Sequence, residues 1–279
     1  MTKPALLLLG AGNMGGALFE AWVETGSLDA ARSAVVDPNP SDAVAALCDQ
    51  HGVALNPAED AGYDACVLAV KPQMFASVLP DLDWPGMADT LFVSIAAGTT
   101  VRTIGQLLAE RAPGARVVRA MPALPAKVRR GVTLLADAPG LTDADRAVAT
   151  DLFEAAGGTY WCRDEDQLDA LMGVTGCSPA FVFLLAEALA DAATQHGTTP
   201  EDARRIAEAS VTGAAALLEA EGREGGGGRD AGTLRRAVTS PRGTTEAALG
   251  VLDDEARGLR PLVRDAVRAA YDRAKALAS

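Results

Sequence analysis

Histidine is scarce in this chain, and the positions of the two histidines argue against one class of catalysis. His51 and His196 each come just before a glycine at which a helix is expected to end. A cation is mildly favoured at a helix C-terminus, so both positions have a structural explanation. Neither histidine follows a buried strand, and a histidine general acid of the hydroxy-acid dehydrogenase kind is therefore disfavoured.

Cysteine is also sparse, and its spacing argues against disulfides and a structural zinc site. No two of the four cysteines form a C-x-x-C pair, and they are far apart: Cys48, Cys66, Cys162 and Cys177. This spacing is typical of buried, reduced thiols in a cytosolic protein. The sequence also lacks the H-E-x-x-H and G-x-S-x-G patterns of zinc proteases and serine hydrolases, and we expect no metal site.

Long apolar runs and basic clusters are missing as well. The apolar run over residues 5–9 is too short for a signal peptide. A second apolar run, residues 181–185, is interrupted by Glu187 and Asp191 before a membrane span could form. The net charge is −12, and no basic run is present that could follow a nucleic-acid backbone. The sequence therefore predicts a cytoplasmic protein that binds neither membranes nor nucleic acid.

The chain does have glycine in an informative pattern near its N-terminus. Leu6–Leu9 reads as a buried strand, and Gly10, Gly12 and Gly15 follow it in the G-x-G-x-x-G spacing of dinucleotide-binding turns. In that pattern Gly10 allows the tight turn, Gly12 lets a pyrophosphate come close, and Gly15 lets the next helix pack against the strand. A turn without a ligand is the alternative, but a strand before and a helix after the glycines favour dinucleotide binding.

The strands expected after this turn are apolar runs separated by helices, as in a parallel sheet that is covered on both faces. We expect further strands over residues 33–36, 53–55, 65–70, 91–95, 116–120, 132–136 and 159–162. Helices are then expected over 167–195, 200–221, 232–238, 244–253 and 259–278, with a flexible glycine loop over 225–228. The fold class is α/β, with an N-terminal doubly wound, Rossmann-type parallel sheet and a C-terminal all-helical domain. We predict a dinucleotide-binding domain over residues 1–162 and a helical substrate and dimerisation domain over 163–279.

The loops that follow the strands are the candidate cofactor site, because ligands of open α/β sheets bind beyond the carboxyl ends of the strands. Asp37 ends the second strand about 20 residues after Gly15, where an acidic residue binds the adenosine ribose. Asn56 is also expected near the adenosine. The full set of expected cofactor contacts is Gly10, Gly12, Asn13, Met14, Gly15, Asp37, Asn56, Val70, Lys71, Pro72, Ala97 and Gly98.

Two segments of the helical half also stand out. The helix expected over residues 180–193 is apolar around most of its circumference and has to be buried. We expect it at a subunit interface, and a central helix of a monomeric bundle is the alternative. The segment Ser240-Pro241-Arg242-Gly243-Thr244-Thr245 opens a later helix with hydroxyls and free N–H groups, which suits an anion. An ordinary helix cap is the alternative there.

Several segments together resemble the pyrroline-5-carboxylate reductase family. They occur in the order of that family, cover nearly the whole chain and are specific only jointly: Gly10-Ala-Gly-Asn-Met-Gly15, Ala69-Val-Lys-Pro-Gln73, Ser94-Ile-Ala-Ala-Gly98, Arg119-Ala-Met-Pro122, Gly176-Cys-Ser-Pro-Ala-Phe181, Glu187-Ala-Leu-Ala-Asp191 and Ser240-Pro-Arg-Gly-Thr-Thr245. The resemblance implies hydride transfer from NAD(P)H to the imine carbon of 1-pyrroline-5-carboxylate, which is the last step of proline biosynthesis. Members of this family are homodimers, or rings of dimers, built through the helical domain.

The resemblance also implies roles for individual residues. Ser240, Gly243 and Thr244 would bind the substrate carboxylate, and Thr245 would be the catalytic residue that hydrogen-bonds to the ring nitrogen. Two further residues, Met121 and Pro122, would hold the ring against the nicotinamide. An imine that arrives already protonated needs little acid–base help from side chains, so orientation and charge placement are the main tasks.

The sequence departs from the family pattern at two positions. Ala123 stands where the family usually has Asn, and Arg242 stands where it prefers Gly. Another cyclic imine or imino acid is therefore an alternative substrate. A non-catalytic nucleotide sensor is a second alternative, which the intact Thr244–Thr245 pair disfavours. A β-hydroxyacid dehydrogenase would need a catalytic lysine in the helical half. The only lysine there is Lys275, near the C-terminus, which argues against this alternative.

The choice of cofactor depends on Asp37. Members of the family often prefer NADPH. An aspartate at this position accepts a hydrogen bond from a ribose 2′-hydroxyl and repels a 2′-phosphate, which favours NADH. Because the family preference and Asp37 indicate different cofactors, we expect either NADP(H) or NAD(H) to serve as the cofactor.

Overall fold

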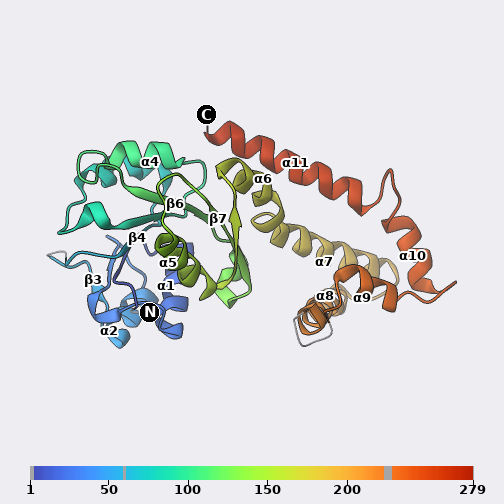
Figure 1. Ribbon diagram of the computed structural model, residues 1–279. Coiled ribbons are helices and arrows are strands. Elements are labelled where there is room, and N and C mark those ends of the chain that lie inside the picture. The colour runs from blue at the N-terminus through green and yellow to red at the C-terminus, as the bar shows by residue number, and fades with distance from the viewer. Residues whose placement is uncertain (1–2, 59–60, 223–227, 279) are drawn as a thin grey trace. The chain divides into compact units, whose positions relative to one another are not determined.

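The computed structural model describes residues 3–58, 61–222 and 228–278. The expected glycine loop over 225–228 lies, except for Gly228, outside these residues. The chain forms two compact units, one of residues 1–176 together with 269–279 and one of residues 177–268. The first unit contains the sheet, and the second is helical (Figure 1).

The sheet has eight strands in the order β3-β2-β1-β4-β5-β6-β7-β8. The strands are β1 (Leu6–Leu9), β2 (Ala34–Val36), β3 (Ala54–Leu55), β4 (Ala65–Leu68), β5 (Leu91–Ser94), β6 (Arg116–Met121), β7 (Gly131–Ala136) and β8 (Gly157–Cys162). The first six strands are parallel to one another, whereas β7 runs antiparallel to β6 and parallel to β8. The β6–β7 connection carries only the 3₁₀ segment η5 (Leu124–Val128), which is too short for a parallel crossover. The predicted doubly wound sheet is thus confirmed, with its last two strands reversed.

The helices of the sheet-containing unit are α1 (Asn13–Thr25), α2 (Asp42–His51), α3 (Phe75–Val78), α4 (Val101–Leu108), α5 (Asp143–Glu154) and α6 (Glu165–Thr175). Two of these helices begin at side-chain N-caps. The Ser41 hydroxyl accepts a hydrogen bond from the N–H of Val44, and Thr142 forms a capping box with Asp145. The last residue of α2 is His51, and a left-handed glycine follows it, as the sequence predicted.

The core of this unit lies on both faces of the sheet. Along β1, Leu6 and Leu8 pack on one face, whereas Leu7 and Leu9 pack on the other. This alternation, with all four residues buried, is the reason that the strand reads as a continuous apolar run. Three of the four free cysteines are buried, and burial raises the pKa of the Cys48 thiol, so that thiol stays protonated.

The single helix expected over residues 167–195 is instead two helices, α6 and α7 (Ser178–Gln195). Pro179 stands in the first turn of α7. A proline has no N–H, and its ring would clash with the carbonyl of Thr175 in a continuous helix. The break at Gly176 and Cys177 removes that clash, and the prediction of one helix was wrong for this reason.

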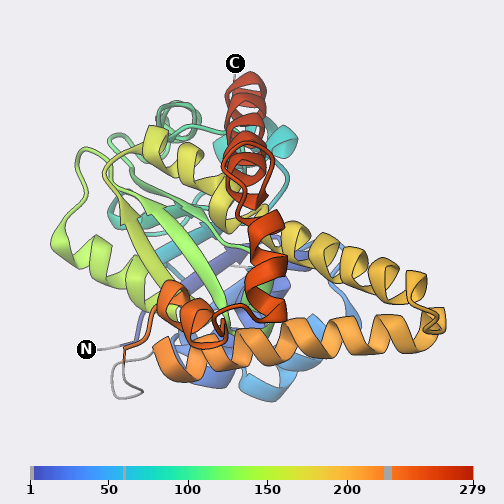
Figure 2. The ribbon, with the colours of Figure 1, turned by 90° about the vertical axis from the view of Figure 1, so that its right-hand side faces the viewer.

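The helical unit exposes much of its apolar surface. Besides α7 it contains α8 (Pro200–Gly222), α9 (Ala231–Ala237), α10 (Thr244–Leu252) and the beginning of α11 (Leu259–Ala278). Figure 2 shows α7 and α8 side by side, joined through a turn at Gly197. Among the described residues between 177 and 268, the buried hydrophobic side chains are Ala203 and Ala207. Phe183 and Leu184 of α7 are 58% and 63% exposed, so α7 is not buried within a single chain.

The stretch Glu165–Gln195, which spans α6 and α7, reaches a mean hydropathy of 1.7. By length and composition alone it could cross a membrane, which the sequence analysis did not expect. An apolar helix that associates with another chain passes the same test, because both environments select apolar surface.

Candidate functional site

The glycine turn between β1 and α1 has the geometry that a dinucleotide-binding turn requires. Gly10 has φ of 90°, and a Cβ there would lie 2.9 Å from the backbone of Ala69 and Val70. A Cβ on Gly15 would lie 2.3 Å from the carbonyl oxygen of Gly10, so only glycine lets α1 approach the turn this closely. At Gly12, by contrast, a Cβ would meet nothing within 4 Å. The fold itself therefore requires Gly10 and Gly15, whereas the space at Gly12 is free for a ligand.

Asp37 lies directly beside this turn. Its carboxylate accepts hydrogen bonds from the N–H of Ala11, at 2.7 Å, and from the N–H of Asn39, at 2.8 Å. The side-chain amide of Asn56 pairs with the backbone N–H and C=O of Asp37, both at 2.9 Å. Asp37 and Asn56, which the sequence placed near the adenosine, are thus held together at the end of β2. These contacts fix the Asp37 carboxylate at the edge of the glycine turn.

The other expected cofactor residues lie at the same edge of the sheet, because β1, β2, β4, β5 and β6 are parallel. Val70 and Lys71 follow β4, and Pro72 begins the 3₁₀ segment η2 (Pro72–Met74). Ala97 and Gly98 follow β5, with Gly98 in a left-handed conformation. At the N-terminus of α1, Gly12 and Asn13 are exposed, and Met14 packs partly against the core. Met121 ends β6, Pro122 follows it, and both are buried.

One residue at this edge was missed by the sequence analysis. Lys127 of η5 donates a hydrogen bond of 2.6 Å to the side-chain oxygen of Asn13, at the start of α1. A groove with a volume of about 800 Å³ runs along the turn and between α1 and α2, and Lys127 lines it together with Gly12, Asn13 and Asp37. The lysine lies five residues after Pro122, which the sequence analysis named as a site residue. Lys127 lies near α1 because of the path of η5, and the residues around Lys127 in the sequence do not indicate this contact.

Apart from Met121 and Pro122, the expected substrate-binding residues lie in the helical unit, around the start of α10. Gly243 is the N-cap of α10, and its N–H donates a hydrogen bond of 3.0 Å to the carbonyl of Ser240. A Cβ on Gly243 would lie 2.3 Å from the Ser240 hydroxyl oxygen, so a larger residue there would force that hydroxyl to rotate away. Thr244 and Thr245 form the first turn of α10, whose N–H groups have no acceptor within the helix. The combination of a hydroxyl and free N–H groups suits a carboxylate.

Arg242, where the family prefers glycine, adopts a left-handed conformation with φ of 59°. Its N–H donates a hydrogen bond of 2.7 Å to a carboxylate oxygen of Glu246. The turn therefore keeps a backbone shape that glycine adopts most readily, although an arginine occupies the position.

Family models match two regions of the chain. Residues 165–277 match "Pyrroline-5-carboxylate reductase dimerisation", and residues 5–98 match "NADP oxidoreductase coenzyme F420-dependent". The first region contains α7 and the Ser240–Thr245 turn, and the second contains the glycine turn and the loops after β4 and β5. The two matches thus cover both turns, whereas Met121, Pro122 and Lys127 lie between the matched regions.

Relatives and solved structures match the full length of the chain. A pyrroline-5-carboxylate reductase of Pseudomonas aeruginosa is 34% identical, over 100% of this chain and 98% of its own length. The corresponding protein of Escherichia coli is 33% identical over 96% of each chain. The structure of a pyrroline-5-carboxylate reductase from Coxiella burnetii, at 32% identity, has a TM-score of 0.86 and covers 100% of both chains. A Plasmodium falciparum pyrroline carboxylate reductase with NADP bound shares the fold at 22% identity, with a TM-score of 0.77. With relatives at this identity over the full length of the chain, the chain belongs to the pyrroline-5-carboxylate reductase family.

Proposed function

We propose that this protein reduces 1-pyrroline-5-carboxylate to L-proline, the last step of proline biosynthesis, with a hydride from NADH or NADPH. The observation that carries the proposal is the presence of two complementary turns in one chain. The glycine turn after β1 offers free space at Gly12 and the start of α1 for a pyrophosphate. The Ser240–Thr245 turn offers a hydroxyl and helix-start N–H groups for a carboxylate.

The roles of individual residues follow from this proposal. The cofactor would lie across the carboxyl edge of the sheet, from Asp37 and Asn56 at the adenosine end to Ala97 and Gly98 at the nicotinamide end. Ser240, Gly243 and Thr244 would hold the substrate carboxylate, and Thr245 would hydrogen-bond to the ring nitrogen. Met121 and Pro122 would limit the space for the ring. Residues 1–162 would thus serve the cofactor, and residues 163–279 the substrate and dimerisation.

The direct test is oxidation of reduced nicotinamide, followed by its absorbance, with racemic 1-pyrroline-5-carboxylate and separately with a six-membered cyclic imino acid. We expect fast turnover of the five-membered ring. A preference for the larger ring would contradict the proposed substrate and would make Ala123 and Arg242 the residues to explain. An absence of turnover with either ring would favour a nucleotide-sensing role.

We expect Asp37→Ser to shift the choice of cofactor toward NADPH. The carboxylate held by Ala11 and Asn39 would repel a 2′-phosphate, and serine removes that charge while it keeps a hydroxyl. The expected result is a lower KM for NADPH and a higher KM for NADH, measured with each cofactor at saturating imine. If the KM for NADPH does not fall in the variant, Asp37 does not set the choice.

The exposed apolar face of α7 supports association with a second copy of the chain. We expect a homodimer, or a ring of dimers, formed through the helical domain in the cytoplasm. The described residues between 177 and 268 bury little hydrophobic surface of their own, so this unit needs a partner to complete a core. A second chain of the same kind supplies the matching apolar face.

We expect Leu184→Glu to convert this oligomer to monomers. Leu184 is 63% exposed in the single chain, and a buried unpaired carboxylate at an apolar interface is strongly unfavourable. The measurement is the mass of the native particle by light scattering. Val128→Glu is the matched control, since Val128 is 70% exposed but lies in η5, outside the helical unit. An unchanged mass for the Leu184 variant would place the interface elsewhere.

A further inference from the structure

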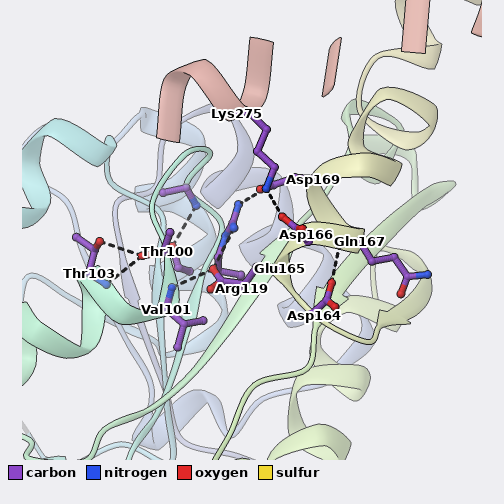
Figure 3. Close-up of polar contacts among 12 residues, drawn as sticks. Thr100, Val101, Thr103, Arg119, Asp164, Glu165, Asp166, Gln167, Asp169 and Lys275 are labelled. Atoms are coloured by element: carbon purple, nitrogen blue, oxygen red, sulfur yellow. Dashed lines mark hydrogen bonds and ion pairs between the residues drawn. The ribbon is translucent and has the colours of Figure 1, made fainter. Parts of the chain in front are cut away.

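An ionic cluster, in which Arg119 and Asp169 are buried and Glu165 is half-buried, joins the nicotinamide end of the sheet to α6 (Figure 3). Its centre is Arg119, which lies in β6 two residues before Met121 and has a side chain that is 4% exposed. Two carboxylates of α6 bind this guanidinium, those of Glu165 and Asp169, each at 3.0 Å. They stand four residues apart and so lie on one face of the helix.

Glu165 has a second partner on a different element. The same oxygen that binds Arg119, Oε1, accepts a hydrogen bond of 3.0 Å from the N–H of Val101. Val101 is the first residue of α4, directly after the loop that contains Ala97 and Gly98. A helix-start N–H has no acceptor within its own helix, and here a side chain 64 residues away supplies one. One carboxylate oxygen therefore ties the β5–α4 loop, the end of β6 and α6 together.

The neighbouring residues hold α6 itself in place. Asp164 caps the helix, and the N–H of Gln167, at 2.7 Å, holds the pKa of that carboxyl below its usual value. Asp166 pairs with Lys275 near the end of α11, and this contact raises the pKa of Lys275. The residues of α11 from 269 onward belong to the same compact unit as the sheet. The helix that carries Glu165 is thus capped at its N-terminus and is joined to α11 through the residue next to Glu165.

We propose that Glu165 is a positioning residue for the reduction, and that it holds the β5–α4 loop and the end of β6 in the arrangement that receives the nicotinamide. A buried ion pair adds little net stability compared with apolar packing, because desolvation offsets most of the attraction. The effect of this ion pair on geometry is larger, because the Val101 N–H and the Arg119 guanidinium bind the same oxygen of Glu165. The proposal rests on the proposed use of NAD(P)H at this edge.

The sharpest test is Val101→Pro, which removes the N–H that Glu165 accepts but leaves every charge in place. Proline is favoured at the first position of a helix, and the preceding residue, Thr100, is already extended, as proline requires. We expect an almost unchanged melting temperature, because the proline restricts the unfolded chain and offsets the lost hydrogen bond. The dissociation constant for NADH is expected to rise by about tenfold, because the β5–α4 loop loses its tie to the end of β6. The measurement is NADH fluorescence on binding, which does not depend on the identity of the imine.

Three further variants separate positioning from stability. In Glu165→Gln the amide oxygen still accepts from Val101, so NADH affinity is expected to fall less than in Val101→Pro. Asp169→Asn removes a charge from Arg119 without touching Val101, and Asp145→Asn does the same to Arg116 at the other end of β6, where the pair is 2.7 Å apart. We expect both to lower the melting temperature and leave NADH affinity within about twofold.

Unchanged NADH affinity in Val101→Pro, or an equal loss in all four variants, would overturn the proposal. If NADH binding follows the expected pattern but the imine is not reduced, the proposed substrate fails and the positioning role stands.

Discussion

Thr245→Ala is expected to lower kcat by about 30-fold to about 1,000-fold while the affinity for the cofactor stays nearly unchanged. In the proposed mechanism the Thr245 hydroxyl contacts the ring nitrogen, where charge changes during hydride transfer. A hydrogen bond aimed at such a position contributes roughly 2–4 kcal/mol to stabilisation of the transition state. The hydroxyl belongs to the first turn of α10, in the helical unit, whereas the cofactor residues lie on the sheet. The substitution should therefore lower kcat without changing the dissociation constant of the cofactor.

The matched controls for this prediction are Thr245→Ser and Thr245→Val. Serine keeps the hydroxyl and should retain most of the activity, whereas valine keeps the shape and should lose as much as alanine. The measurement is kcat at saturating imine and cofactor, together with the dissociation constant of the reduced nicotinamide. A Thr245→Ala enzyme with the kcat of the unchanged protein would remove this residue from the mechanism.

The second large effect is expected at the glycine turn, where two similar substitutions should impair the enzyme for different reasons. Gly12→Ala adds a methyl group that meets no atom of the protein, at a residue whose extended backbone alanine readily adopts. We expect an unchanged melting temperature, but a decrease in kcat/KM of about 100-fold, which is the cost of displacing a bound group by about 1 Å. The loss should appear in the KM for the cofactor.

Gly15→Ala places its methyl group 2.3 Å from the Gly10 carbonyl oxygen, so α1 has to move away from the turn. Overpacking of this kind costs about 1–3 kcal/mol of folding free energy, and the cofactor turn is distorted as well. Thermal unfolding, measured alongside cofactor binding, distinguishes the two variants. Gly105→Ala is the control within α4, since a Cβ there meets nothing within 4 Å and alanine favours the helix. Equal melting temperatures for the Gly12 and Gly15 variants would contradict the distinct roles assigned to these glycines.

The sequence by itself determined the architecture and most of the candidate site. The G-x-G-x-x-G spacing, the continuous apolar strands and the caps at Ser41 and Thr142 are local patterns, and each depends on residues that are close together in the chain. Asp37 and the loops after β4 and β5 could be placed for the same reason, because parallel strands bring their carboxyl ends to one edge. The break before α7 was also present in the sequence, at Pro179, but the apolar periodicity on either side concealed it.

The tertiary structure alone decided which distant side chains meet. The contact between Lys127 and Asn13 joins residues 114 apart, and the Arg119–Asp169 pair spans 50 residues. Such contacts leave no periodic signal, since a charged residue on a strand or helix has the same local pattern whether or not it finds a partner. The exposure of the apolar α7 was decided in the same way, because the sequence shows that this helix needs burial but not that its own chain leaves it uncovered. Local chemistry therefore specified the two turns, whereas long-range packing placed the ionic cluster between α6, β6 and the start of α4.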